Sequence, residues 1–216
     1  MEEAKTSEKR KQTAGEEIAN SISHGVGLIG AIVSIPILIF FLEPGKDNID
    51  LIGVLVFAVS MVLLYLASTM YHALPEGKAK RVFQIMDHTA IFLLIAGTYT
   101  PFALSTLRGP WGWSLFGLIW LLAIFGIGLE LGGKFKSGKY SNILYLAMGW
   151  TGVLVIKPLI TNMHTQGLMW LAIGGLFYSL GVFFYAKDRK RYFHFVWHFF
   201  VLAGSVSHFF AVFWYA

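Results

Sequence analysis

Side chains that can bind a metal occur at helical spacing within apolar stretches of this sequence. His194 and His198 are four residues apart, and Ser68 and His72 repeat this spacing earlier in the chain. Residues four apart share one face of a helix, so each pair can reach a single point. The sequence contains no cysteine, which excludes thiolate ligands, disulfides and a cysteine nucleophile.

Three histidines from two helices, His72, His194 and His198, can hold a zinc ion and leave its fourth position open. Catalytic zinc sites have this arrangement, because the open position binds water or substrate. A bound Zn²⁺ lowers the pKa of its water to about 7, which gives hydroxide at neutral pH. Asp87 would accept a hydrogen bond from this water and act as general base. Ser68 would orient the water or polarise a carbonyl group.

A structural role is the alternative, because single membrane histidines often form hydrogen bonds between helices. We favour it for His88, which points about 100° away from Asp87 on a helix. We also favour it for His208, which lies about 15 Å beyond His198. His164 falls in a connecting loop. H-x-x-x-H lacks the glutamate of H-E-x-x-H proteases, so a general base must come from another helix. Spacing alone leaves metal binding and a structural role open for the three predicted ligands.

Composition and long apolar runs indicate a helical membrane protein. Of 216 residues, 56% are hydrophobic and 13% are charged, about half the charged share of a soluble domain. A run of about 20 apolar residues spans a bilayer as a helix. Seven runs are predicted, at about 20–42, 49–74, 82–107, 111–131, 141–160, 168–186 and 192–216. The expected fold is all-α and polytopic, with seven transmembrane helices over residues 17–216 after a flexible cytoplasmic tail at 1–16. The fifth run is the weakest, because Lys157 and Pro158 interrupt its end.

The lysines and arginines in the connections predict the orientation of the chain. With the N-terminus in the cytoplasm, the outer side holds only Lys46, Arg108 and Lys157. The inner side then holds fourteen, which are Lys5, Lys9, Arg10, Lys11, Lys78, Lys80, Arg81, Lys134, Lys136, Lys139, Lys187, Arg189, Lys190 and Arg191. The C-terminus is therefore expected outside. The net charge of +5 follows this topology and does not indicate a nucleic-acid partner.

This orientation brings polar groups of four spans to one depth near the cytoplasmic face. Asp87 is expected five residues into the third span, a depth of about 8 Å. The last span carries His194 and His198 two and six residues from its start. Ionisable groups inside spans are costly and are usually functional. The other members of this layer are Ser68 and His72 at the end of the second span and Glu17, Asn20 and His24 at the entry of the first.

These residues resemble the motifs of a known family. Residues 17–24, EIANSISH, resemble the E-x-x-N-x-x-x-H entry motif of the progestin and adipoQ receptor family, which belongs to the CREST superfamily. Residues 68–72, STMYH, resemble its S-x-x-x-H motif, and 194–198, HFVWH, its H-x-x-x-H motif. Asp87 matches its third-span aspartate. Short loops and an aromatic last span resemble the bacterial branch, the hemolysin III homologues. The resemblance covers residues 17–216.

The resemblance implies a seven-helix protein with an intramembrane Zn²⁺ held by His72, His194 and His198. It implies that Asp87 contacts a zinc-bound water and that Ser68 supports the site. It also implies a multi-pass protein of the bacterial inner membrane with a membrane lipid as substrate or ligand. The tail of about 16 residues lacks the long cytosolic segment of the animal receptors, so a hormone-receptor role is not implied.

Three functions follow as alternatives. The first is a zinc-dependent hydrolase of lipid amides or esters, since the superfamily includes alkaline ceramidases. The second is a sensor of membrane lipids, or a membrane-homeostasis protein, in which the metal fixes helix geometry without turnover. The third is a pore-forming cytolysin, an activity attributed to the bacterial branch. Pore formation has the least physical support, because the predicted spans have no polar stripe to line a channel.

Overall fold

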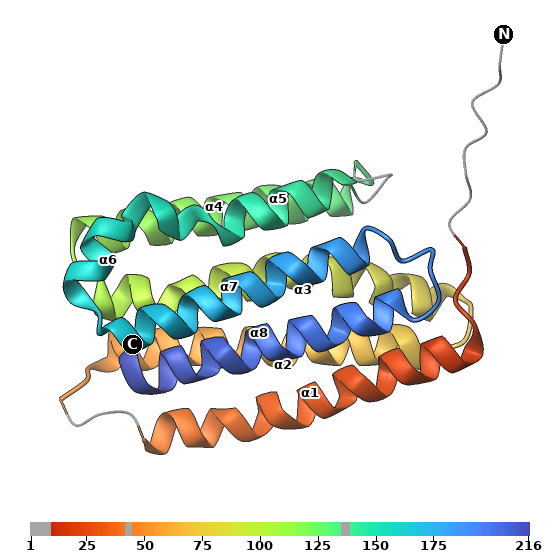
Figure 1. The fold of residues 1–216 in the computed structure, drawn as a ribbon, viewed down its shortest axis with the longest axis horizontal. Coiled ribbons are helices and arrows are strands. Elements are labelled where there is room, and N and C mark those ends of the chain that lie inside the picture. Colours follow the sequence, from red (N-terminus) through yellow and green to blue (C-terminus); the bar gives the residue numbers. More distant parts are fainter. Residues whose placement is uncertain (1–9, 42–44, 135–138) are drawn as a thin grey trace, which may run out of the picture.

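The computed structural model describes residues 10–41, 45–134 and 139–216, and these residues contain helices and no β-strand. Seven helical spans are long and apolar enough to cross a membrane, which confirms the predicted fold class. The spans run side by side along the long axis of the molecule (Figure 1). Most of the predicted tail, residues 1–9, lies outside the described residues. The elements are α1 (Ala14–Phe40), α2 (Asn48–Ala73), α3 (Lys78–Pro101), the π-helix η1 (Phe102–Thr106), α4 (Pro110–Leu131), α5 (Lys139–Gly149), the 3-10 helix η2 (Thr151–Val155), α6 (Ile156–Asn162), α7 (Thr165–Tyr185) and α8 (Phe193–Tyr215).

The first helix begins earlier than the apolar pattern predicts. α1 starts at Ala14 rather than Asn20, so the last three residues assigned to the tail are helical. A capping box explains this start, because Thr13 accepts from the Glu16 backbone N–H and Glu16 accepts from that of Thr13. The box satisfies N–H groups that a helix otherwise leaves unpaired at its start. A helix boundary is therefore set here by polar residues, before the apolar run begins.

The third helix also begins earlier, and this changes the position of Asp87. α3 starts at Lys78 instead of Val82, so Asp87 is nine residues into the helix, not five. At 1.5 Å per residue its distance from the helix start is about 14 Å instead of about 8 Å. Lys80 stabilises this first turn, because its buried ammonium donates to the backbone carbonyl of Tyr71 at 2.7 Å.

The fifth span is interrupted, but not where its proline predicts. α5 ends at Gly149, and the 3-10 helix η2 separates it from α6. Pro158 is instead the third residue of α6, where a missing backbone N–H costs little. The break is held from α3 by Tyr99, whose hydroxyl donates to the Gly149 carbonyl at 2.6 Å and accepts from the Gly152 N–H at 2.9 Å.

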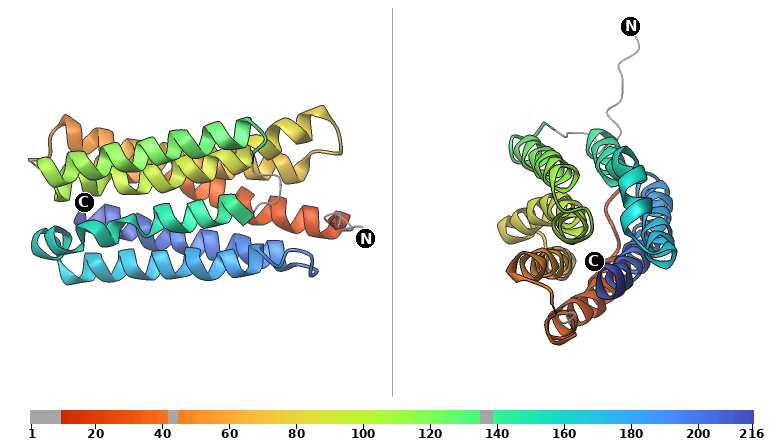
Figure 2. Two further views of the ribbon diagram at one scale, coloured as in Figure 1. Left: turned by 90° about the horizontal axis from the view of Figure 1, so that it is seen from above. Right: turned by 90° about the vertical axis from the view of Figure 1, so that its left-hand side faces the viewer.

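The seven spans form a closed ring when the bundle is seen along its axis (Figure 2). Each span contacts the next one along the chain, and α8 contacts α1. α1, α3 and α8 begin, and α2 ends, at one end of the bundle, which we call the histidine end. The ring encloses a cavity of about 430 Å³ that begins beside His194 and His198. It continues between α3, α5 and α7 to Leu107 and Leu168, near the opposite end.

Candidate metal centre

Three histidines meet at the histidine end, from the end of α2 and the beginning of α8. His72, His194 and His198 are 3%, 9% and 1% exposed. One ring nitrogen from each lies within 4.8 Å of the others, a spacing at which the three could hold a metal ion. The ring centroids of His194 and His198 are 4.9 Å apart, and each is 5.1 Å from that of His72. The three histidines therefore lie close enough to reach one point, as their spacing in the sequence predicts.

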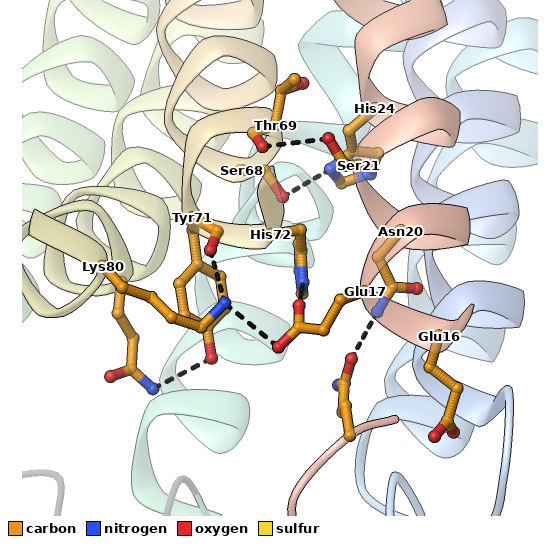
Figure 3. A network of polar contacts seen from close by, with 12 residues as sticks. Glu16, Glu17, Asn20, Ser21, His24, Ser68, Thr69, Tyr71, His72 and Lys80 are labelled. Carbon is orange, nitrogen blue, oxygen red and sulfur yellow. Dashed lines mark hydrogen bonds and ion pairs between the residues drawn. The ribbon is translucent and has the colours of Figure 1, made fainter. Parts of the chain in front are cut away.

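The His72 ring is fixed by a carboxylate from α1. Its Nδ1 lies 2.7 Å from one oxygen of Glu17, whose other oxygen lies 3.1 Å from the Lys80 ammonium (Figure 3). A neutral imidazole that donates from Nδ1 to a carboxylate keeps a lone pair on Nε2, the form that ligates metals. His72 Nε2 is buried and has no hydrogen-bond partner among the described residues. This orphaned nitrogen fits a metal ligand, because a buried polar atom without a partner is costly.

The His198 ring is also held from α1. Its Nδ1 lies 3.2 Å from the carbonyl oxygen of Asn20 and 2.9 Å from the hydroxyl of Ser23. A carbonyl only accepts, so Nδ1 carries the proton and Nε2 keeps its lone pair. The Asn20 side chain donates in turn to the Gln12 amide oxygen at 2.5 Å (Figure 3). The predicted supporting residues Glu17 and Asn20 therefore contact two of the three histidines.

Ser68, Asp87 and the third supporting residue, His24, form a second polar group beside the three histidines. His24 Nδ1 lies 2.7 Å from the Ser68 hydroxyl, which is hydrogen-bonded to the Asp87 carboxyl. With Asp87 ionised, its carboxylate only accepts, so Ser68 would donate to Asp87 and accept from the His24 Nδ1–H. The His24 ring also stacks on His198, with centroids 3.5 Å apart and an interplanar angle of 8°. Ser68, Asp87 and His24 line the same cavity as His194 and His198.

The remaining histidines lie apart from this group. His88 Nδ1 is 2.9 Å from Glu130 on α4, and His208 Nε2 is 3.3 Å from the Leu171 carbonyl on α7. Both contacts join neighbouring helices, as predicted for these two residues. His164 precedes α7 and is exposed, in agreement with its expected place in a connecting loop.

Sequence reasoning missed the residues that hold this site from outside the motifs. Ser23 contacts His198, Gln12 holds Asn20, and Glu16 accepts from Arg10 and from the backbone of Tyr192. A capping box read from Thr13 and Glu16 would have moved the predicted start of α1. No comparable signal marks Ser23, because a serine in an apolar helix is common.

The cavity beyond these polar groups is lined mainly by apolar side chains. His24, Ser68, Asp87, His194 and His198 form its wall at the histidine end. Elsewhere its wall is made mostly of leucine, isoleucine, valine and aromatic residues, with Leu94, Ile95, Phe102, Leu115, Leu171 and Val201 among them. An extended apolar ligand with one polar end fits such a space, because the polar end would meet hydrogen-bonding groups.

The fold and this group define a class: a seven-helix membrane protein with a buried three-histidine cluster that could hold a metal ion. Within that class, residues 12–209 match the family model described as haemolysin-III related, and the chain belongs to this family. It is 44% identical to Hemolysin-3 of Bacillus cereus, with 94% of this chain and 93% of that protein covered. It is 40% identical to the Hemolysin-3 homolog of Bacillus subtilis (strain 168), with 94% and 95% covered. It is also 30% identical to the human monocyte to macrophage differentiation factor, with 94% and 85% covered. No solved structure matches the chain.

Proposed function

We propose that this protein is a zinc-dependent hydrolase of a lipid amide or ester. The observation that supports it is the wall of one cavity, where Asp87 and Ser68 lie beside two of the three clustered histidines. Imidazole ligands suit zinc, copper, iron and nickel. Three histidines with a free position are typical of catalytic zinc. When bound, Zn²⁺ would act as a Lewis acid and lower the pKa of a water molecule.

The protein groups have distinct roles in the proposed reaction. Asp87 takes a proton from the water that attacks the carbonyl carbon of the lipid. The C–N or C–O bond then breaks, and the proton passes from Asp87 to the leaving amine or alcohol. Ser68 donates its hydrogen bond to Asp87 or to the carbonyl oxygen of the substrate. Its contact with His24 at 2.7 Å limits the hydroxyl to these directions.

Glu17 and Asn20 support the reaction indirectly in this proposal. By accepting from the Nδ1 atoms of His72 and His198, they direct both Nε2 lone pairs toward the metal. Such partners of ligating histidines fix the tautomer and the orientation of the ring.

Two other functions are alternatives to hydrolysis. A lipid sensor would use the same metal cluster to fix helix geometry, and it would bind lipid in the cavity without cleaving it. The name of the Bacillus cereus relative suggests cytolysis. The cavity wall argues against an ion-conducting pore, because apolar side chains do not replace the hydration of ions.

We also propose that the histidine end faces the cytoplasm of a bacterial cell and that the protein resides in its inner membrane. Bacterial relatives match over almost their whole length. The distribution of lysine and arginine, fourteen on one side of the seven spans and three on the other, supports this orientation. A reporter fused after Ala216 should then be active outside, and one inserted after Gly133 should be active inside. Reporters active on the same side would contradict the orientation.

The Asp87→Asn variant separates a hydrolase from a sensor. Asparagine keeps the shape and one hydrogen-bond acceptor but cannot take the proton. Zinc should stay bound, because His72, His194 and His198 remain. The rate of hydrolysis should fall by about 10²–10⁴-fold, the usual contribution of general acid–base catalysis. The measurement is fatty-acid release from amide and ester lipids in vesicles, with zinc content measured on the same preparations.

A His194→Ala preparation provides the background for this assay. Fatty-acid release by the wild type that equals this background would refute the hydrolase and leave the sensor. If Asp87→Asn cleaves lipid as fast as the wild type, the role of Asp87 as general base is wrong.

A further inference from the structure

The residue that begins α8 has an unusual backbone conformation. Tyr192 is the N-cap of α8, with φ 60° and ψ 5°. It is the single non-glycine residue with positive φ in the described part of the chain. This left-handed region is unfavourable for a tyrosine, because its Cβ approaches the following carbonyl oxygen. The turn is therefore held by other contacts, and His194 follows it by two residues.

A buried glutamate on α1 holds this turn. The Glu16 carboxylate is 2% exposed and accepts from the Tyr192 backbone N–H at 2.8 Å. It also accepts from both terminal nitrogens of Arg10, at 2.9 and 2.6 Å. Thr13 donates to it from its backbone N–H and its hydroxyl, each at 2.9 Å. Its negative charge is therefore paired and fully hydrogen-bonded.

Arg10 extends the same connection to the loop before α8. Its Nε donates to the Arg189 carbonyl at 2.9 Å, while its terminal nitrogens hold Glu16. The start of α1 is thus joined to the α7–α8 connection at two points. Arg10 contacts Arg189 before the left-handed turn, and Glu16 contacts Tyr192 within it. The Glu16 hydrogen bond also raises the pKa of the Arg10 guanidinium, so this residue stays charged.

The contacts of α1 reach all three histidine positions. Glu17 contacts His72, and Ser23 contacts His198, each through the histidine ring. The segment that carries His194 is reached through its backbone, by Glu16. Glu16 and Glu17 are consecutive, so one helical turn connects to both helices that carry the cluster.

We propose that Glu16, held by Arg10, is a positioning residue that fixes the left-handed turn at Tyr192 and so delivers His194 into the metal cluster. The proposal rests on metal binding by the three histidines, which is part of the proposed function, but it does not require turnover. Without the carboxylate, the turn would relax toward negative φ, and the first turn of α8 would change direction. His194 lies in that turn, so the cluster would lose one ligand while His72 and His198 keep their partners.

Metal affinity measured by chelator competition on the full chain in detergent tests this role. Glu16→Gln should weaken Zn²⁺ binding by about 10–100-fold, the usual effect of losing a group that orients a ligand. Glu76→Gln is the matched control, because Glu76 is an exposed carboxylate at the same end of the bundle. It should bind Zn²⁺ like the wild type. Arg10→Gln should have a smaller effect of the same sign, because Glu16 remains but loses one partner.

A rescue variant distinguishes positioning from a general loss of stability. Glycine adopts positive φ without the steric cost, so Tyr192→Gly should bind Zn²⁺ within a few-fold of the wild type. The double variant Glu16→Gln/Tyr192→Gly should recover at least half of the lost affinity on a logarithmic scale. Visible absorption of the Co²⁺-loaded protein should show the same loss and recovery, because it reports ligand number and geometry.

Four results would overturn the proposal. One is Zn²⁺ affinity of Glu16→Gln equal to that of Glu76→Gln. Another is a loss of Zn²⁺ affinity in Glu16→Gln that the added Tyr192→Gly change does not recover at all. A third is an Arg10→Gln variant that folds and binds Zn²⁺ like the wild type. A wild type that binds no metal removes the positioning role together with the metal site. Metal binding without any lipid hydrolysis refutes the proposed hydrolase but leaves this proposal intact.

Discussion

The two sides of the cavity differ in how their helices are joined. On the side formed by α1, α2 and α8, buried polar side chains connect one helix to another. Examples are Tyr65 with Ser205 at 2.7 Å and Ser23 with His198 at 2.9 Å. On the other side, the fifth span is divided into α5, η2 and α6, and its wall toward the cavity is largely apolar. The contacts that hold the histidine rings therefore lie on α1, α2 and α8, while α3, α5 and α7 supply much of the apolar wall of the cavity.

The difference follows from what each side must hold. Histidines that hold a metal would tolerate only small errors in position, so their rings need partners on the neighbouring helix. A cavity for a flexible apolar molecule needs no such precision, and its wall can have a break in the helix. Hydrogen bonds from Trp150 to Ser179 and between Tyr99 and Gly149 secure that break at single points.

The largest expected effect is on the rigid side. The wild type should bind about one zinc per chain, and His194→Ala/His198→Ala should abolish this binding because it removes two of the three proposed ligands. His88→Ala and His208→Ala are the controls, because these rings contact Glu130 and Leu171 instead of the cluster. Elemental analysis of purified protein measures the metal. Full zinc content in the double variant would show that the cluster is not the binding site.

Substitution of two neighbouring glycines of α7 tests how tightly its two faces are packed. A Cβ on Gly174 would overlap the His208 ring of α8, whereas one on Gly175 would meet nothing within 4 Å. Gly174→Ala should therefore destabilise the protein by about 1–3 kcal/mol through overpacking. Gly175→Ala should be neutral or stabilise it by up to about 1 kcal/mol, because alanine is the better helix former. Thermal unfolding in detergent measures the stability of both variants. Equal losses of stability would contradict the difference in packing between Gly174 and Gly175.

The smallest effect is expected in the connection before α2, far from the cluster. Backbone N–H groups of Asp50 and Ile49, together with Arg108, hold the pKa of Asp47 below its usual value. The contribution of a carboxylate with a lowered pKa is present at neutral pH and is lost as the pH falls through that pKa. Arg108→Gln should therefore lower the unfolding midpoint by no more than about 2 °C at pH 7, because Arg108 and Asp47 are both largely exposed, although Arg108 also contacts the buried Asp50 at 3.1 Å.

The difference between Arg108→Gln and the wild type should shrink below about pH 4, where the carboxyl groups become protonated. High salt should reduce it as well, because the pair is exposed. A larger difference at low pH than at neutral pH would have the wrong sign.

The sequence was sufficient to predict the fold and the cluster of histidines. Apolar runs gave seven spans, and His194 and His198 were found because helical periodicity makes residues four apart neighbours. The starts of α1 and α3 were wrong, because the prediction followed the apolar runs and ignored polar residues that continue a helix. The break at Gly149 was missed because tertiary contacts from Tyr99 decide it. The contact of Glu16 with Tyr192 was missed because the two residues are 176 apart in the sequence.

The contact between Glu16 and Tyr192 joins residues that are 176 apart in the sequence, so it can form only late in the synthesis of the chain. At about 5–20 residues per second, roughly 9–35 s pass between translation of Glu16 and of Tyr192. Glu17 can pair with His72 early in that interval, but His194 and His198 on α8 are translated after it. Until α8 is translated, Glu16 therefore lacks the Tyr192 N–H, although Arg10 and Thr13 can already pair with it. Insertion of α8 brings His194 and His198 to His72 and so completes the histidine cluster that could hold a metal ion.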